Sequence, residues 1–283
     1  MRRRRFAQLD VFASEPFSGN PLACVIDADG LSTEEMHRFT KWTNLSEASF
    51  LLKPTVPEAD YRVRIFTAPR ELPFAGHPTI GSCQAWLNAG GQPKTSGRIV
   101  QECGAGLVEL KQTDDQIAFA APPLIRAGEV EESFIVEMAA VLGIGRDEVI
   151  DAQWGDNGPG WVVLMLESAE AVLALTPPTG PLAELDLGVV GLYPDDSDLG
   201  CAVEIRAFFA DGTGAIFEDP VTGSLNASVA HWLLKSGQLT APYVASQGAA
   251  LGRRGRISID QDPDGTIWVG GVATESITGE IEI

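Results

Sequence analysis

Three titratable side chains stand where proton transfer is the natural chemistry: Glu47, His77 and Asp219. Glu47 leads into an apolar run, residues 48–52, and part burial at the start of a strand raises a carboxyl pKa toward the range of a proton shuttle. His77 and Asp219 each precede a proline, and both groups accept and release protons. Each residue also has an alternative without catalytic function. Glu47 would be a solvated residue at a strand end, His77 a hydrogen-bonded histidine of the core, and Asp219 the N-cap of a helix.

An internal repeat relates two of these residues. Residues 63–68 resemble residues 205–210 at a shift of 142. The same shift aligns His77-Pro78 with Asp219-Pro220 and Gly81-Ser82 with Gly223-Ser224. A shift of half the chain predicts two structurally similar halves. The alternative is a chance similarity between short strand–turn–helix segments.

Each repeated segment is expected to begin a helix. Proline suits the first helical position, and glycine lets a ligand approach the backbone. Free N–H groups and the positive end of the helix dipole then favour an anion. If the halves face each other about a pseudo-twofold axis, both helix starts converge on a substrate carboxylate and stabilise charge on an enediolate-like intermediate.

The elements that must position these residues are mostly strands, which predicts an α+β protein. A helix is expected over 32–43, where Ser32 and Glu35 form a capping box, another over 134–142 and a weak one over 182–184. The expected strands are residues 6–12, 23–26, 49–52, 61–66, 97–102, 107–112, 116–120, 161–166, 202–209, 256–259, 266–270 and 277–283. Their connections are too short for many parallel crossovers. Residues 121–123 read as the crossing between domains, and 151–159 as a loop that lines the pocket.

Composition excludes several classes of function. The 283 residues carry a net charge of −19, which argues against nucleic-acid binding and against an anionic membrane surface. The chain shows neither a signal-peptide pattern nor a run of about 20 apolar residues, so we expect a cytoplasmic protein. Four cysteines and three histidines lack metal-site spacing, so no metal is expected. Nucleotide-binding and esterase motifs are absent from the sequence.

Six motifs in this order resemble the PhzF-like family, the phenazine-biosynthesis isomerase and its relatives. They are residues 9–12 (LDVF), 17–23 (FSGNPLA), 44–47 (NLSE), 74–79 (FAGHPT), 218–224 (EDPVTGS) and 246–248 (SQG). The resemblance spans almost the whole chain, and the motifs are specific as a set.

The resemblance implies a diaminopimelate-epimerase-like fold. Two pseudo-symmetric domains would each wrap a mixed sheet or barrel around a central helix. We expect residues 1–122 with the final strand 272–283 in one domain and 123–271 in the other, with the active site in the cleft between them. The family also implies a homodimer and an isomerase that needs no cofactor. In the phenazine enzyme the substrate is a dihydro-hydroxyanthranilic acid.

The family's functional residues carry over by motif. Glu47 matches the glutamate that moves a proton along the substrate ring. His77 and Asp219 match the polar pair that orients the amine and hydroxyl region of the substrate. Gly76, Ser224 and the Gly223 amide match contacts to the substrate.

Two other functions stay open on the sequence. Epimerase relatives use two cysteines at their helix starts, whereas here neither 76–82 nor 218–224 contains one. A thiol-based amino-acid racemase would therefore need Cys83 or Cys103, and we expect both to be buried free thiols. A binding protein without catalytic activity is the other alternative, because one fold hosts many functions. In each case the expected ligand is a small carboxylate.

Overall fold

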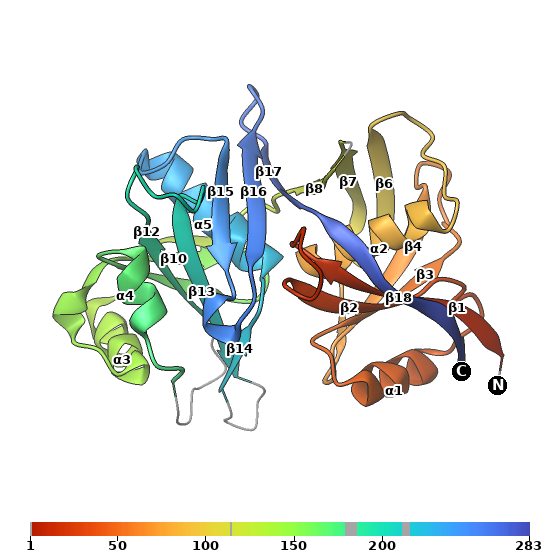
Figure 1. The fold of residues 1–283 in the computed structure, drawn as a ribbon, viewed down its shortest axis with the longest axis horizontal. Coiled ribbons are helices and arrows are strands. Elements are labelled where there is room, and N and C mark those ends of the chain that lie inside the picture. The colour runs from red at the N-terminus through yellow and green to blue at the C-terminus, as the bar shows by residue number, and fades with distance from the viewer. Residues whose placement is uncertain (1, 114, 179–185, 211–215) are drawn as a thin grey trace. The chain divides into compact units, whose positions relative to one another are not determined.

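The structure is a computed structural model that describes residues 2–113, 115–178, 186–210 and 216–283 (Figure 1). The chain divides into two compact units. Unit 1 comprises Met1–Ala120 and Gly270–Ile283, and unit 2 comprises Ala121–Val269. The division expected from the sequence differs from this one by two residues at each crossing. The weak helix expected over 182–184 lies outside the described residues.

Unit 1 is built on one mixed sheet. Its elements are β1 (Arg3–Val11), β2 (Asn20–Val25), α1 (Thr33–Thr43), β3 (Ala48–Leu52), β4 (Tyr61–Phe66), β5 (Glu71–Leu72), α2 (Gly76–Asn88), β6 (Arg98–Cys103), β7 (Gly106–Gln112), β8 (Ile117–Ala120) and β18 (Ala273–Glu282). The strands pair in the order β18-β1-β2-β3-β4-β6-β7-β8, and β5 pairs with β4. Only β2–β3 and β4–β6 are parallel among these pairs. The predicted capping box of α1 is confirmed, since Ser32 and Glu35 satisfy each other's backbone N–H groups.

Unit 2 repeats this arrangement. Its elements are β9 (Arg126–Glu129), α3 (Glu132–Leu142), β10 (Val149–Asp156), β11 (Val162–Leu166), α4 (Ala169–Ala174), β12 (Asp186–Leu192), β13 (Val203–Ala210), β14 (Ile216–Asp219), α5 (Gly223–Ser236), β15 (Tyr243–Gln247), β16 (Gly255–Gln261) and β17 (Ile267–Gly271). The pairs β11–β12 and β13–β15 are parallel, as their counterparts in unit 1 are. The α+β class and the internal duplication are therefore confirmed.

The last strand of each repeat pairs outside its own repeat. β9 follows β8 along the chain but pairs with β10 of unit 2. β18 follows β17 but pairs with β1 of unit 1. This exchange is why the end of the chain belongs to unit 1.

The alignment of the two repeats differs from the one expected in their second part. Arg64 on β4 and Arg206 on β13 keep the shift of 142. After these strands the shift becomes 147, because β4 pairs Phe66 with Glu71 whereas β13 pairs Phe208 with Glu218, across a connection five residues longer. The helix starts, Gly76 and Gly223, follow the new shift.

The predicted equivalence of His77 with Asp219 is therefore wrong, and so is that of Gly81-Ser82 with Gly223-Ser224. In the folded chain the counterpart of His77 is Ser224, because each is the second residue of its helix. Asp219 ends β14 and pairs with Ala207, so it belongs to the sheet.

The predicted place of the two prolines is also wrong. Pro78 is the third residue of α2, where the absent N–H costs no helical hydrogen bond. Pro220 precedes α5, whose N-cap is Thr222. Asp219 is consequently not an N-cap.

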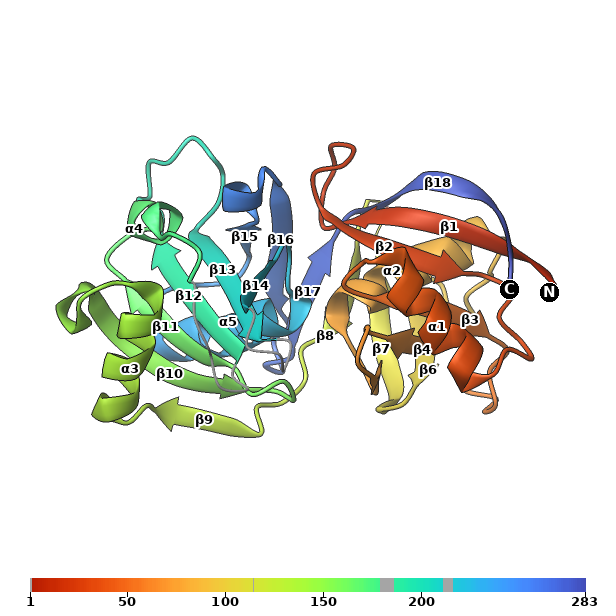
Figure 2. The same cartoon turned by 90° about the horizontal axis from the view of Figure 1, so that it is seen from below.

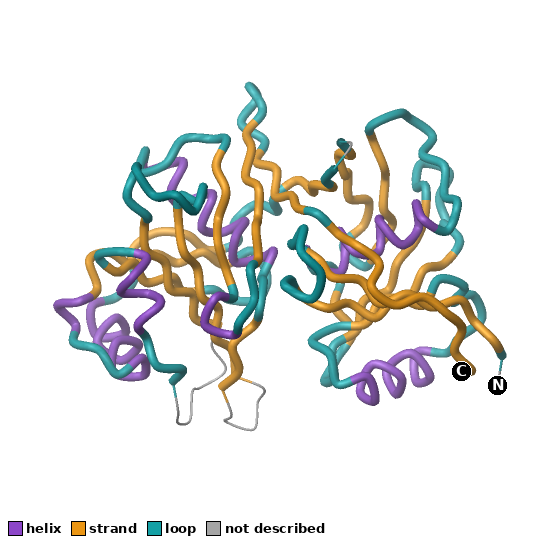
Figure 3. The backbone as a smooth tube through the Cα atoms, in the orientation of Figure 1, coloured by secondary structure: helices purple, strands orange, loops and turns teal. Residues whose placement is uncertain are grey.

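A central helix fills each unit (Figures 1 and 3). α2 packs against β1, β2, β3, β4, β8 and β18, whereas α1 packs against β3 and β4 (Figure 2). Small residues let α2 enter the sheet: a Cβ on Gly81 would lie 2.5 Å from Leu22 Cδ2. α5 is likewise buried along Leu225–Ala230 and contacts β10 and β16. A helix segment buried on all sides needs mostly apolar or small residues, and the buried parts of both helices have them.

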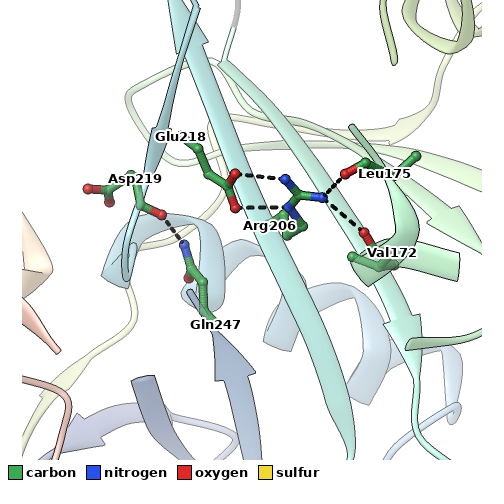
Figure 4. Close-up of polar contacts among 6 residues, drawn as sticks. All are labelled: Val172, Leu175, Arg206, Glu218, Asp219 and Gln247. Atoms are coloured by element: carbon green, nitrogen blue, oxygen red, sulfur yellow. Dashed lines mark hydrogen bonds and ion pairs between the residues drawn. The ribbon is translucent and has the colours of Figure 1, made fainter. Parts of the chain in front are cut away.

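One ion pair occurs in both repeats, in different surroundings. Arg64 donates to both carboxylate oxygens of Glu71 at 2.7 and 2.6 Å, and this pair is partly exposed. Arg206 donates to both oxygens of Glu218 at 2.8 and 2.7 Å, and both side chains are buried. Nη1 of Arg206 also donates to the carbonyl oxygens of Val172 and Leu175 (Figure 4). The second arginine thus joins β13, β14 and the end of α4.

Replacing either arginine by methionine tests how burial changes the contribution of the ion pair to the free energy of unfolding. Arg206→Met leaves the Glu218 carboxylate buried without its partner, so the free energy of unfolding should fall by about 3–5 kcal/mol at neutral pH. Arg64→Met removes the half-exposed counterpart and should cost about 1 kcal/mol or less. Urea denaturation of both variants measures the difference. Equal losses would contradict the structural role given to the buried pair.

Candidate functional site

Two candidate residues of unit 1 meet in a hydrogen bond. Glu47 lies between α1 and β3, after Asn44 has turned the chain out of the helix with a φ of 57°. His77 lies in the first turn of α2. The distance from Glu47 Oε2 to His77 Nδ1 is 3.1 Å. The His77 side chain is 4% exposed and that of Glu47 is 18% exposed, so the part burial expected for Glu47 is found.

The hydrogen bond to Glu47 determines which ring nitrogen of His77 is a donor and which is an acceptor. An ionised carboxylate only accepts hydrogen bonds, so Nδ1 carries the donated hydrogen, and in the neutral ring Nε2 is then an acceptor. Nε2 of His77 is buried and has no hydrogen-bond partner within the described residues. Buried polar atoms are rarely left so. A titratable pair with one unused ring nitrogen is suited to moving a proton to or from a bound molecule.

A buried network fixes the start of α2. The Tyr61 hydroxyl donates to Gln101 Oε1 at 2.9 Å, and Gln101 Nε2 donates to Thr79 Oγ1 at 3.0 Å. Thr79 is two residues after His77 in the helix. Gly76 begins α2 after Ala75, whose side chain makes no cap hydrogen bond to the first-turn amides. Such amides favour a negatively charged group.

In unit 2, Thr222 and Gln247 are hydrogen-bonded to Asp219. The Thr222 hydroxyl donates to Asp219 Oδ2 at 2.6 Å. Gln247 Nε2 donates to the Asp219 backbone oxygen at 3.1 Å (Figure 4). The carboxylate is half-buried at the end of β14, three residues before the N-cap of α5.

Ser224 is held by the connection between β10 and β11. Trp161 Nε1 donates to Ser224 Oγ at 3.0 Å, and Asn157 Nδ2 donates to the Ser224 backbone oxygen at 2.8 Å. Gly223, the first residue of α5, is buried. The loop expected over 151–159 is only partly a loop, because β10 continues to Asp156 through pairing with β9 and β11.

The structure therefore groups the candidates by unit. Glu47, His77 and Gly76 lie together in unit 1, whereas Asp219, Gly223 and Ser224 lie on or beside the start of α5 in unit 2. Sequence reasoning missed the side chains that hold the second group, which are Thr222, Gln247, Trp161 and Asn157. Two of them stood inside recognised motifs, 218–224 and 246–248, and that was the available signal.

The cysteines lack the properties of catalytic thiols. Cys83 is fully buried in α2, and burial raises its pKa to about 12. Burial also raises the pKa of Cys103, which is half-buried. Because the thiolate is the nucleophile and base, a raised pKa leaves little of the reactive form at neutral pH.

No group of three or more His, Cys, Asp or Glu side chains in the described part of the chain is placed to hold a metal ion. Among the described helices, none is long and apolar enough to cross a membrane.

The sequence is similar to known proteins along nearly its whole length. A family model described as "Phenazine biosynthesis-like protein" matches residues 9–279. Antisense-enhancing sequence 1 of Schizosaccharomyces pombe is 38% identical, with 99% of each chain covered. Trans-2,3-dihydro-3-hydroxyanthranilate isomerase of Pseudomonas aeruginosa is 33% identical, with 89% of this chain and 88% of the relative covered.

Solved structures resemble the whole chain. A PhzF-family protein of Bacillus anthracis has a TM-score of 0.85 at 22% identity, with 100% of both chains covered. A predicted epimerase of Pseudomonas aeruginosa has a TM-score of 0.78 at 26% identity, with 99% of both chains covered. A hydroxyproline epimerase of Agrobacterium vitis has a TM-score of 0.59 at 12% identity, with 99% of this chain and 91% of that chain covered, which shows a shared fold.

A glycine substitution tests the packing behind Asp219. Gly248 has a φ of 93°, and a Cβ there would lie 2.5 Å from the backbone oxygen of Pro220. Gly252 also has a positive φ, 69°, but its Cβ would meet nothing within 4 Å. Gly252→Ala should therefore lower the free energy of unfolding by about 1 kcal/mol through backbone strain alone. Gly248→Ala should cost about 1–3 kcal/mol more because it displaces the 219–220 backbone.

Chemical denaturation of the two glycine variants measures both losses. The close approach of residues 247–248 to the Asp219 segment is contradicted if Gly248→Ala costs no more than Gly252→Ala.

Proposed function

The chain belongs to the phenazine biosynthesis-like family, and on that basis we propose that it is an isomerase that shifts a proton between carbon atoms of a small carboxylate without a cofactor. The observation that carries the proposal is the hydrogen-bonded pair of Glu47 and His77 at the start of a buried helix. A carboxylate and an imidazole in contact are a common acid/base pair.

The proposed step moves one proton and no net electrons. The Glu47 carboxylate takes a proton from a substrate carbon, and the electron pair of that C–H bond spreads into the adjacent conjugated system. The proton on the neutral Glu47 exchanges with solvent, and Glu47 then returns a proton to a different carbon, which restores the carboxylate. Substrate and product differ only in the position of one hydrogen and of the double bonds.

The surrounding groups have separate parts in this proposal. His77 Nδ1–H holds Oε2 of Glu47, so the other carboxylate oxygen is the one that takes the proton. The uncapped amides at the start of α2, beginning at Gly76, stabilise negative charge that develops on the substrate. In unit 2, Asp219, Ser224 and the Gly223 amide are the groups proposed to bind polar substituents of a substrate.

The first substrate to test is trans-2,3-dihydro-3-hydroxyanthranilate. A relative 33% identical to this chain is named for the isomerisation of that compound. It carries a carboxylate, an amine and a hydroxyl on a ring with conjugated double bonds, which suits the step written above.

Deuterium uptake tests Glu47 as the proton carrier. A panel of small carboxylates that includes this compound is incubated with the protein in D₂O and followed by NMR. Wild type should introduce deuterium at carbon into at least one of them. Glu47→Gln should lower the rate by about 10²–10⁴-fold, the usual contribution of a general acid/base.

Glu109→Gln is the matched control, because Glu109 forms an exposed pair with Arg98 and should leave the rate unchanged. Equal uptake by wild type and Glu47→Gln would contradict the role of Glu47. Binding to wild type with neither deuterium uptake nor a change in the positions of the double bonds in the NMR spectrum would instead indicate a binding protein without catalytic activity.

Substitution of the cysteines separates this mechanism from a thiol-based racemase. The high pKa of Cys83 and the raised pKa of Cys103 keep both thiols protonated, so a variant without either thiol should retain activity within about twofold. The combination Cys83→Ala with Cys103→Ser is measured in the same deuterium assay. A loss of more than about 100-fold with an unchanged circular dichroism spectrum would favour thiol chemistry.

A further inference from the structure

The amide of Gln247 is a buried junction between three segments of unit 2. Gln247 ends β15 and is 1% exposed. Its Oε1 accepts from the Thr222 backbone N–H at 3.0 Å and from Asn226 Nδ2 at 2.9 Å. Its Nε2 donates to Thr222 Oγ1 at 2.9 Å and to the Asp219 backbone oxygen at 3.1 Å. The full hydrogen-bonding capacity of the amide is used.

Backbone groups settle which way this amide points. The N–H of Thr222 is a donor only, so the atom that faces it is the oxygen Oε1. The backbone oxygen of Asp219 is an acceptor only, so the atom that faces it is the nitrogen Nε2. Nε2 therefore donates into the hydroxyl oxygen of Thr222. The single hydrogen of that hydroxyl is left for the carboxylate of Asp219, 2.6 Å away.

The hydroxyl of Thr222 binds Asp219 and not the first turn of its own helix, where an N-cap hydroxyl usually binds. Thr222 is the N-cap residue of α5, and N-cap threonines ordinarily accept a hydrogen bond from the first turn of their helix. Thr222 makes no such bond. Its hydroxyl lies instead between Gln247 and Asp219.

Unit 1 contains a similar contact between a helix and a glutamine, but without the connection to a carboxylate. Thr79 and Asn226 are equivalent at the shift of 147, and each bonds to a glutamine on the strand that follows its helix. Gln247 lies two residues further along its strand than the counterpart of Gln101. Gln101 fills its oxygen with the Tyr61 hydroxyl, whereas Gln247 reaches the helix start and Asp219. The junction to the helix is thus shared, and the connection to a carboxylate is particular to unit 2.

We propose that Thr222 and Gln247 are positioning residues for Asp219: Gln247 orients the Thr222 hydroxyl, and that hydroxyl orients the carboxylate that binds substrate. The inference rests on the proposed function, since it assigns the positioning of a residue of that same site. The new element is the positioning of Asp219, whereas its contact with the substrate belongs to the proposed function.

Two substitutions at Thr222 separate orientation from bulk. Thr222→Val keeps the shape and removes the hydroxyl, so kcat of the isomerisation should fall about tenfold, while anthranilate binding measured by calorimetry should weaken about fivefold. Thr222→Ser keeps the hydroxyl and should stay within about threefold of wild type in both assays. Gln247→Glu places an oxygen against two acceptors and should lower kcat at least as much as Thr222→Val.

The matched control is Thr40→Val. Thr40 is a fully buried threonine of α1 whose hydroxyl donates to the Met36 carbonyl oxygen at 2.9 Å, outside the site. It should lose thermal stability comparably to Thr222→Val, with unchanged kcat and unchanged anthranilate binding.

A double-mutant cycle with Asp219→Asn decides whether Thr222 acts through Asp219. In the Asp219→Asn background, Thr222→Val should have less than twofold further effect on kcat and on binding. Independent, multiplicative effects would overturn the inference, and so would wild-type behaviour of Thr222→Val.

The measurement of anthranilate binding distinguishes a failure of this inference from a failure of the proposed function. If wild type binds anthranilate but isomerises nothing, the proposed function fails, and the binding cycle still decides on Thr222 and Asp219. If wild type isomerises and the cycle is additive, the inference alone fails. Absence of anthranilate binding to wild type would overturn the inference too.

Discussion

The N–H groups at the starts of two buried helices, which the N-cap side chains do not bind, are the constraint on which this structure depends. Backbone donors inside a protein must be paired, and the first turn of a helix cannot pair its own. The side chain of Ala75 cannot cap α2, and the hydroxyl of Thr222 makes no hydrogen bond to the first turn of α5. Both helix starts therefore suit a polar ligand, and the candidate residues His77 and Ser224 occupy the same second position in their helices.

Duplication supplied two similar units, and substitution then made them different. The Arg–Glu pair that is partly exposed in unit 1 is fully buried in unit 2, where Arg206 also holds the end of α4. At the helix starts, one unit presents an imidazole bound to a carboxylate and the other a hydroxyl bound to an indole. The shared framework fixes where the groups lie, whereas their chemistry is set by single residues.

Local patterns in the sequence predicted much of this framework. The capping box at Ser32 and the strand Tyr61–Phe66 depend on neighbouring residues, and both are confirmed. The fold class followed from strand spacing, and the duplication followed from the match of residues 63–68 with residues 205–210, the one part of the repeat that strand pairing retains.

The errors arose where tertiary contacts decide. The connection between β13 and β14 is five residues longer than the one between β4 and β5, so two dipeptide matches in the sequence are coincidental. Only the strand pairing reveals the true alignment. The segment 151–159, rich in glycine and polar residues, reads as a loop, yet pairing on both sides makes most of it a strand. The partners of Gln247 lie more than 20 residues away along the chain, so no local pattern predicts them.

The position of the hydrogen on the His77 ring shows whether His77 and Glu47 are paired in solution. Long-range ¹H–¹⁵N NMR correlations on uniformly ¹⁵N-labelled protein report which ring nitrogen of each histidine carries a hydrogen, and His77→Asn assigns the signal. The account predicts a hydrogen on Nδ1 of His77 in wild type, and a changed Nδ1 signal when Glu47 is replaced by glutamine. A wild-type His77 whose Nδ1 carries no hydrogen would contradict the pairing with Glu47 from which the proposed chemistry starts.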